Sequence, residues 1–225
     1  MPKRFTFKVK RHNAQIGSRK ATVIPKHSFT CKLKGRRCKG RVGAVRCKRN
    51  TIIGTSWCWQ HLLKTHFLRI KTSKNPSYGK GLFAERKGAD FNRRFPLPVF
   101  VEGDVIVEYL GEKISQQKLD ERYPGDDVTA PYTFRTGAEP ATFIDAACHR
   151  GVGSMINHDK RRANAKAVEG DGTDGRQHII QIIATKRILT NEEILINYAD
   201  SDPYGRADYK FNDQNVTHTT YNSKN

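Results

Sequence analysis

The segments M-I-N-H at residues 155–158 and E-E-I-L-I-N-Y at residues 192–198 decide the fold of this chain. The first places an amide, Asn157, beside an imidazole, His158, after a run of small and apolar residues. The second is apolar, favours a β-strand and ends in Tyr198. The two segments predict a C-terminal half built from strands that carry polar groups at their ends.

The rest of the C-terminal two thirds also favours short strands bounded by Gly, Pro, Asn and Asp. A loop rich in Gly and Asp at 170–175 precedes an apolar run at 178–189. The stretch V-I-V-E-Y at 105–109 alternates as a half-buried strand does. Residues 115–123 favour a helix, because a serine is placed to cap its start and a Pro-Gly pair to stop it. We therefore expect a mainly β body with few short helices.

The order of these motifs resembles the SET family of protein-lysine methyltransferases, and the resemblance covers residues 75–205. The N-H dipeptide and the strand that ends in Tyr198 are similar to the family's two signature segments. Four upstream motifs follow in the family's order: G-K-G-L-F-A at 79–84, E-G-D-V-I-V-E-Y-L-G-E at 102–112, Y-T-F at 132–134 and I-D-A at 144–146. The resemblance implies a SET-type β fold whose two C-terminal segments thread through each other as a pseudoknot.

The same resemblance implies S-adenosylmethionine as methyl donor and a lysine amine as acceptor. Tyr198 matches the family's channel tyrosine, and Tyr132 matches a tyrosine of the channel wall. Asn157 and His158 match the pair that holds the adenosyl moiety. The turn at the cofactor's amino-acid end contains Lys80, Gly81 and Leu82. Each residue also has a structural interpretation, since a G-x-G step is often only a turn and a tyrosine that ends a strand is often a core residue.

Lysine methylation sets physical demands that a narrow channel meets. The amine must arrive without a proton, and desolvation lowers the pKa of a lysine because it disfavours the ammonium form. Orientation of the amine toward the methyl group supplies much of the rate. Fixed dipoles, such as tyrosine hydroxyls and backbone carbonyls, stabilise the charge that moves.

Several positions depart from the family pattern. Ser154 stands where an arginine is common, and Asp159 and Lys160 replace a Ser-Cys step, whereas Asn164 still matches. No cysteine cluster follows Tyr198, so an aromatic lid near the C-terminal tail (206–225) would have to close the channel. Its candidates are Tyr204, Tyr209 and Phe211, and the alternative is that the substrate peptide itself closes the channel. Ile196 lacks a hydroxyl that could retain a water molecule against further methylation, so we expect di- and trimethylated products.

Charge is distributed unevenly along the 225 residues. Residues 1–100 hold 26 Lys/Arg and 2 Asp/Glu, whereas residues 101–225 hold 15 and 20, within a net charge of +19. Such asymmetry is typical of a polyanion-binding region joined to an ordinary domain. Residues 1–30 are expected to form a flexible basic arm. Nucleic acid is the expected partner, and the alternative is a basic tail that serves only solubility or nuclear import.

Four of the five cysteines lie between positions 31 and 58, a clustering that favours a metal over disulfides. Cys38, Cys47, Cys58 and His61 make a closed set of three thiolates and one imidazole, as in structural zinc sites. Residues 31–66 therefore predict a small zinc-binding motif. Cys31 could replace Cys38 as a ligand. His61 or His66 could instead be plain surface histidines, and the C-x-x-H spacing favours His61 as the ligand. Trp57 and Trp59 could stack on bases or form a small apolar core.

The acidic body suits a basic peptide, because Asp120, Glu121, Asp126 and Asp127 cluster around the expected central helix. We expect a histone tail, H3 being the family's commonest choice, or another basic protein. No membrane-spanning or secretory segment is visible in the sequence, so a nuclear setting is expected, with a viral or cytoplasmic one as alternatives. The competing hypothesis is a catalytically inactive SET-like protein that binds chromatin or nucleic acid through its basic, zinc-containing region.

Overall fold

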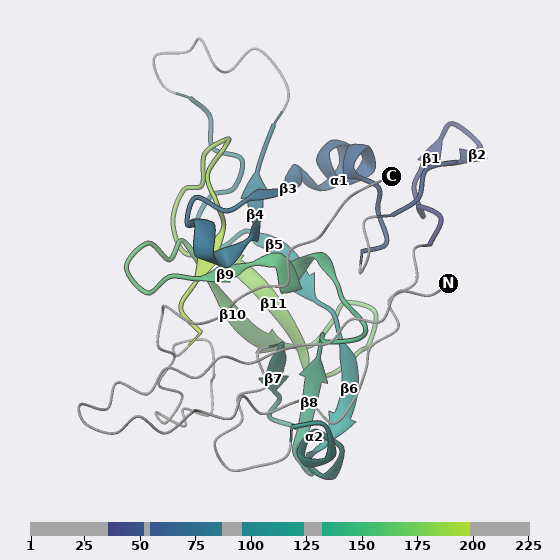
Figure 1. Ribbon diagram of the computed structural model, residues 1–225, viewed down its shortest axis with the longest axis vertical. Helices are drawn as coiled ribbons and strands as arrows, with labels where there is room; N and C mark the ends of the chain where they lie inside the picture. Colours follow the sequence, from purple (N-terminus) through teal and green to yellow (C-terminus); the bar gives the residue numbers. More distant parts are fainter. Residues whose placement is uncertain (1–35, 52–54, 87–95, 124–131, 199–225) are drawn as a thin grey trace, which may run out of the picture.

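The computed structural model describes residues 36–51, 55–86, 96–123 and 132–198 (Figure 1). The predicted basic arm, the spare ligand Cys31 and the predicted aromatic lid lie outside these ranges. Within them no helix is long and apolar enough to cross a membrane.

A five-stranded sheet forms the centre of the molecule, in the order β5-β11-β10-β12-β9 (Figure 1). Its strands are β5 (Val105–Tyr109), β9 (Asn157–His158), β10 (Ala165–Gly170), β11 (Ile179–Ala184) and β12 (Leu195–Ile196). β12 pairs in parallel with both β10 and β9, and the remaining pairs are antiparallel. The short β12 thus joins β9, from the first signature segment, to the rest of the sheet.

Two smaller sheets flank the central one. A hairpin pairs β3 (Leu68–Thr72) with β4 (Lys80–Ala84), and a second sheet has the order β6-β8-β7. Its strands are β6 (Glu112–Ser115), β7 (Thr133–Arg135) and β8 (Thr142–Asp145). Helix α2 (Gln116–Arg122) follows β6 directly, and the Ser115 hydroxyl caps it by accepting a bond from the Lys118 amide (3.3 Å). Short 3-10 turns, η1 (Pro76–Tyr78) and η3 (Val152–Met155), complete this part.

A small Cys/His module precedes the hairpin. It contains strands β1 (Arg41–Val42) and β2 (Val45–Arg46) and helix α1 (Trp59–His66). α1 ends at Phe67, whose left-handed backbone (φ 54°) turns the chain into β3. The expected fold class, mainly β with few short helices and a preceding Cys/His module, is confirmed.

One hydrophobic core joins the module's helix to the sheets. Leu62 of α1, Leu68 of β3 and Leu82 of β4 are at most 1% exposed and belong to the same cluster as Ile180 and Ile182 of β11. Burying an aliphatic side chain of this size contributes about 1.5–3 kcal/mol, so these contacts hold α1 firmly against the body.

The second signature segment is less regular than its sequence predicts. Instead of one strand over 192–198, only Leu195–Ile196 pairs as a strand. The Leu195 amide donates to the side-chain oxygen of Asn164 (2.9 Å), and the Ile194 amide donates to the carbonyl of Leu82 (2.8 Å). Because these two amides bond to a side chain and to a strand of another sheet, the segment does not form one continuous strand over residues 192–198.

Candidate active site and metal centre

The two signature segments lie side by side at the edge of the central sheet. Leu195 is paired with Asn157 and Ile196 with His158. The backbone amide of Tyr198 donates to Nδ1 of His158 (3.0 Å), and its hydroxyl donates to the Ile156 carbonyl (2.8 Å). The His158 and Tyr198 rings are 5.2 Å apart. The structure therefore brings together three of the residues singled out by sequence, Asn157, His158 and Tyr198.

Asn157 connects these segments to the G-x-G turn. Its side chain is buried, and Nδ2 donates to Oε1 of Glu193 (2.9 Å) and to the Lys80 carbonyl (3.2 Å). Its Oδ1 atom is also buried and accepts no hydrogen bond within the described part of the chain. A buried acceptor without a donor costs about 1–3 kcal/mol, so this atom is suited to a ligand that carries N–H groups.

Gly81 lets the side chains of Glu193 and Asn157 lie directly against the G-x-G turn. A Cβ atom there would lie 2.2 Å from Oε1 of Glu193 and 2.9 Å from Nδ2 of Asn157. Glu193, which sequence reasoning did not single out, is 3% exposed and also accepts from the Lys74 amide (3.0 Å). Leu82 is fully buried in the core beside them. The G-x-G step is thus more than a turn, since its glycine admits a buried polar pair.

Asn164 holds the second signature segment in place. Its Nδ2 atom donates to the Glu193 carbonyl (2.9 Å), while its Oδ1 atom accepts from the Leu195 amide (2.9 Å). One side-chain amide therefore replaces two ladder bonds and fixes the backbone on either side of Ile194.

A group of tyrosines lies next to this arrangement. The buried Tyr109 hydroxyl donates to the Tyr132 carbonyl (2.9 Å), which also accepts from the Ala146 amide (2.8 Å). Burial raises the pKa of Tyr109 well above its usual value, and nearby Tyr198 and Tyr132 add to the effect. The pKa of Tyr198 is raised by burial and, to a smaller extent, by Tyr132 and Tyr78. Tyr109 and Tyr198 are therefore neutral at physiological pH and act as hydrogen-bonding dipoles rather than as phenolates.

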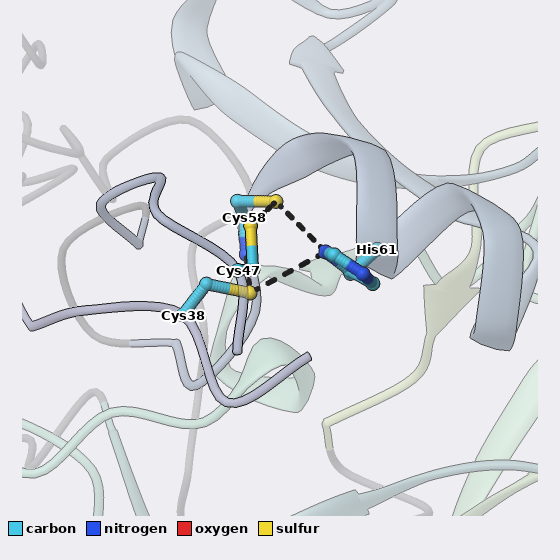
Figure 2. A group of neighbouring side chains, drawn as sticks. All are labelled: Cys38, Cys47, Cys58 and His61. Atoms are coloured by element: carbon cyan, nitrogen blue, oxygen red, sulfur yellow. Dashed lines mark hydrogen bonds between the residues drawn. The ribbon is translucent and has the colours of Figure 1, made fainter. Parts of the chain in front are cut away.

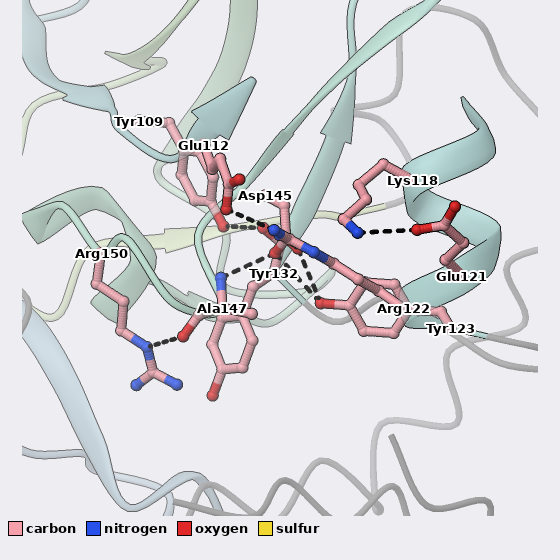
Figure 3. Close-up of polar contacts among 10 residues, drawn as sticks. All are labelled: Tyr109, Glu112, Lys118, Glu121, Arg122, Tyr123, Tyr132, Asp145, Ala147 and Arg150. Carbon is pink, nitrogen blue, oxygen red and sulfur yellow. Dashed lines mark hydrogen bonds and ion pairs between the residues drawn. The ribbon is translucent and has the colours of Figure 1, made fainter. Parts of the chain in front are cut away.

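A buried ionic network supports the strand segment beside Tyr132 (Figure 3). Asp145 is fully buried and accepts from the Arg122 guanidinium (2.8 Å), the Tyr123 hydroxyl (3.2 Å) and the Ala147 amide (2.8 Å). Arg122 also pairs with Glu112 (2.6 Å). The network connects α2 to the ends of β6 and β8. Directly after β8, the Ala146 amide donates to the Tyr132 carbonyl, so the network also supports the position of Tyr132.

Arg150 is a further charged residue at this place that sequence reasoning missed. Its Nε atom donates to the Ala147 carbonyl (3.3 Å), and its guanidinium stands 4.4 Å from the centre of the Tyr132 ring (Figure 3). A cation over an aromatic face is attracted to the ring's negative quadrupole. The contact fixes the orientation of the Tyr132 ring.

Two departures from the family pattern have local structural roles. The Ser154 hydroxyl donates to the Gly151 carbonyl (2.8 Å) and is buried, so it caps its own turn. Asp159 accepts from the Arg161 and Arg162 amides and pairs with the Arg162 guanidinium (2.6 Å). Burial would raise the pKa of Asp159, but its bonds from Arg162 outweigh this and lower it. The added negative charge is therefore paired within its own turn.

The module's candidate ligands meet at one point (Figure 2). Their ligand atoms all lie within 4.8 Å of one another, and all four residues are buried: Cys38, Cys47, Cys58 and His61. The backbone amides of Gly40 and Cys58 donate to the Cys38 sulfur (3.3 and 3.1 Å) and fix its position among the other ligand atoms. A bond from the Arg49 backbone is the main reason that the pKa of Cys47 falls to about 7. Three sulfurs and one nitrogen suit a tetrahedral zinc ion.

The position of His61 is set by its outer nitrogen. Nε2 donates to the Arg41 carbonyl (3.0 Å), which leaves Nδ1 facing the sulfurs of Cys58 (3.3 Å) and Cys38 (3.6 Å). Such an outer hydrogen bond fixes the ring for metal binding. A Cβ atom on Gly40 would lie 2.4 Å from this ring, so only glycine fits there.

The two tryptophans of the module differ in their surroundings. Trp57 packs against both the cysteine cluster and the main core, and its ring is 5.2 Å from that of His66. Burial lowers the pKa of His66. Trp59 is 47% exposed. The small-core interpretation therefore holds for Trp57, whereas Trp59 stays open to a partner.

Comparison with known proteins relates part of this chain to a known family. Residues 98–199, a little under half of the chain, match the family model described as SET domain. Recognition of this family from its motifs is thereby confirmed.

The chain is similar to much larger curated proteins. It is 34% identical over 140 residues to the histone-lysine N-methyltransferase, H3 lysine-4 specific, of Aspergillus oryzae, covering 60% of this chain and 10% of that protein. It is 30% identical over 139 residues to the histone-lysine N-methyltransferase set1 of Dictyostelium discoideum, covering 60% and 8%. The chain thus spans about a tenth of the length of these relatives.

Among solved structures, the chain is similar to the Chaetomium thermophilum polycomb repressive complex 2, with 24% identity and a TM-score of 0.44. That match covers 60% of this chain and 16% of the other. A second structure of this complex, with H3K27me3 and H3K27M, has 26% identity and a TM-score of 0.46. It covers 58% of this chain and 14% of that one.

Proposed function

We propose that this protein is an S-adenosylmethionine-dependent protein-lysine methyltransferase that acts on a histone tail, with H3 as the expected histone. The observation that carries the proposal is the buried, unbonded Oδ1 atom of Asn157 beside the Lys80 carbonyl. Two acceptors at one place suit the ammonium group at the amino-acid end of the cofactor. They lie next to the segment that positions the Tyr198 hydroxyl.

Each candidate residue has a defined task in this proposal. The resemblance assigns Asn157 to the adenosyl moiety together with His158, but the bond of Asn157 to the Lys80 carbonyl favours a role at the cofactor's amino-acid end, beside the backbone of residues 80–82. His158 would hold the adenosyl moiety. When bound, the cofactor supplies an electrophilic methyl group on a sulfonium ion. Tyr198 and Tyr132 would orient the substrate amine, which has released its proton to water. Because Tyr109 and Tyr198 stay neutral, these phenols do not add an anion that would stabilise the ammonium form.

The substrate class follows from charge and from the relatives. Asp120 and Glu121 are carried by α2, beside the network that supports Tyr132. Two of the similar proteins are named as H3 lysine-4 methyltransferases of Aspergillus species. Because Glu121 pairs with Lys118 (2.8 Å), Asp120 is the carboxylate of this helix that a lysine-rich histone tail would meet. Labelled-cofactor assays on nucleosomes, free histones and ribosomal proteins test this, and exclusive labelling of ribosomal proteins would contradict a histone substrate.

Cofactor binding separates an active enzyme from the competing inactive SET-like protein. Titration calorimetry should show S-adenosylmethionine binding to the full chain. Asn157→Ala should weaken binding by about 10- to 100-fold, since hydrogen bonds to charged groups contribute about 1.5–3 kcal/mol. Thermal melting of the same variant verifies that it folds. Absence of binding to the unaltered chain would favour the inactive alternative.

The product state depends on Ile196. A side chain without a hydroxyl retains no water beside the amine, so the second and third methyl groups have room. Di- and trimethyl-lysine should accumulate in a long mass-spectrometric time course at high enzyme concentration. A product that stays monomethylated would refute this expectation.

A second partner is nucleic acid, engaged by the basic N-terminal region in a nuclear, chromatin-bound setting. The support is the excess of 26 Lys/Arg over 2 Asp/Glu in residues 1–100. Binding of this kind releases counterions, so affinity for DNA should fall steeply as salt rises. A salt-independent affinity would contradict the proposal.

A further inference from the structure

We propose that the β1–β2 ribbon of the Cys/His module binds the phosphodiester backbone of double-stranded nucleic acid through one face that carries five basic residues. The inference deepens the nucleic-acid binding proposed above and rests on it. It is independent of the methyltransferase chemistry.

The ribbon is longer than its two named strands. An antiparallel bridge pairs Arg37 with Asn50, and the strands pair Arg41 with Arg46 and Val42 with Val45. Between them, backbone bonds run from Cys38 to Arg49 (2.9 Å) and from Cys47 to Gly40 (2.7 Å). One continuous register therefore extends from residues 37 and 50 to the turn at Gly43, whose φ is +59°.

This register sorts the side chains onto two faces, because directly paired residues share a face and successive pairs alternate. One face carries the pairs 38/49, 40/47 and 42/45, which include two of the candidate metal ligands. The opposite face carries the pairs 37/50, 39/48 and 41/46. Its basic residues are Arg37, Lys39, Arg41, Arg46 and Lys48, all of them exposed.

Nothing on the ribbon neutralises this face. Residues 36–66 contain eight Lys/Arg and no Asp or Glu. Like charges placed directly opposite each other destabilise a β-ribbon, and here Arg41 faces Arg46 while the register opposes Lys39 to Lys48. Folding alone gives no reason to place Lys39 opposite Lys48, whereas a polyanion does. A regular row of phosphates is the partner whose charge complements the face.

The ribbon is held rigidly, as a binding element should be. The Arg41 carbonyl accepts from His61, which anchors the strand to the metal centre. Arg37 donates to the carbonyls of Cys47 and Arg46, and Arg46 donates to those of Cys38 and Arg37. These two guanidinium groups clamp the base of the ribbon and keep their positive charge. Figure 1 shows the ribbon at the periphery of the molecule, away from the central sheet.

An anionic lipid surface is the main rival partner. The apolar tip that would enter a membrane consists of Val42 and Val45, which are 68% and 60% exposed. Fully burying two valines contributes about 3–6 kcal/mol, below the level of stable anchoring. The row of charges behind the tip follows a strand, which suits a linear polyanion better than a plane.

The test uses the full, zinc-loaded chain and the double variant Lys39→Gln/Lys48→Gln. Fluorescence anisotropy measures its affinity for a short DNA duplex, and for an RNA duplex of the same sequence, over a series of salt concentrations. The slope of log affinity against log salt should fall in magnitude by about 2 on the preferred duplex, since each lost phosphate contact removes about 0.9. Thermal stability should stay level or rise, because a like-charge pair is removed.

The matched control is Lys166→Gln/Lys186→Gln, which removes the same charge from exposed positions on the SET body. It should leave the slope nearly unchanged, and both variants should retain one zinc per chain. Equal slopes for the ribbon variant and the unaltered chain would overturn the inference while leaving nucleic-acid binding by other residues intact. Ribbon-dependent binding confined to vesicles with anionic lipid would overturn it as well.

Discussion

The hydroxyl of Tyr198 donates a hydrogen bond to the backbone carbonyl of Ile156. Its position relative to the N-H pair is set by the backbone, because the Tyr198 amide bonds to His158 and Ile196 is paired with His158. Removing the oxygen should therefore leave the fold intact and affect only the chemistry.

We expect Tyr198→Phe to lower kcat by about 100-fold or more, the magnitude typical for loss of one preorganised dipole. Cofactor affinity should change by no more than about threefold, within about 0.7 kcal/mol. Steady-state methylation assays and calorimetry measure the two quantities. Tyr123→Phe is the control, since it also removes a buried hydroxyl bond but lies at the α2 network. Equal loss of kcat in both variants would argue against a specific role of Tyr198.

The sequence allowed some of these residues to be predicted and not others. Asn157, His158 and Tyr198 carry rare side-chain types at a recognisable spacing, so their meeting could be predicted. Glu193 could not be identified as the partner of Asn157, because the bond joins positions 36 apart and depends on the missing Cβ of Gly81. Its only signal was the doubled glutamate before an apolar run. The role of Arg150 could not be predicted, because nothing in a sequence with many arginines indicates that this one lies over the Tyr132 ring.

The buried ion pair between Arg122 and Asp145 helps to attach helix α2 to the body. Arg122→Met leaves the carboxylate of Asp145, which is fully buried, without its cationic partner. We expect a loss of about 3–5 kcal/mol in the free energy of unfolding, measured by urea denaturation. Asp145→Asn retains an acceptor for the Ala147 amide and removes the charge, so together with Arg122→Met it should recover part of the loss. A double variant as unstable as the sum of the singles would show that the two groups are not coupled.

The β3–β4 hairpin should make stability depend on pH. Glu85, next to β4, pairs with Arg69 and Lys71 of β3, both at 2.5 Å. Burial would raise the pKa of Glu85, but the bonds from Lys71 and Arg69 outweigh it, and the pKa lies below its ordinary value of 4.5. A lowered carboxyl pKa stabilises the folded state above that value, and the stabilisation is lost as pH falls below it. Urea midpoints of Glu85→Gln and the unaltered chain should converge in acid, and parallel profiles would contradict this.

Elements were easier to predict than their lengths. The strand at 105–109 and the helix after Ser115 follow from local periodicity and capping, and both exist as expected. The strand over 192–198 is shorter than predicted because Asn164, from another part of the chain, takes one of its amides. A bond between a distant side chain and a backbone leaves no periodic trace, so sequence patterns cannot limit such a strand.

At the scale of the whole molecule, the metal centre and the SET body share helix α1. His61 faces the sulfurs, while the next residue, Leu62, packs in the main core. Zinc binding should therefore stabilise more than the module itself. A strong chelator or Cys47→Ser should abolish stoichiometric zinc, shift the emission of Trp57 to the red and lower the melting temperature. Val45→Ser on the exposed ribbon should change none of these. An unchanged melting temperature after zinc removal would show that the module folds independently of the body.

The place of β12 between β10 and β9 has a consequence for how the chain is made. Both neighbours are synthesised before residues 195–196, yet the two strands pair only with β12 at this place and not with each other. In a nascent chain the edge of β9 that pairs with β12 therefore stays unpaired until synthesis has passed Tyr198. Parallel pairings between distant segments form slowly, and unfilled strand edges invite wrong partners. A chain truncated at residue 190 lacks β12 and should therefore remain bound to chaperones, whereas the full chain should complete the sheet.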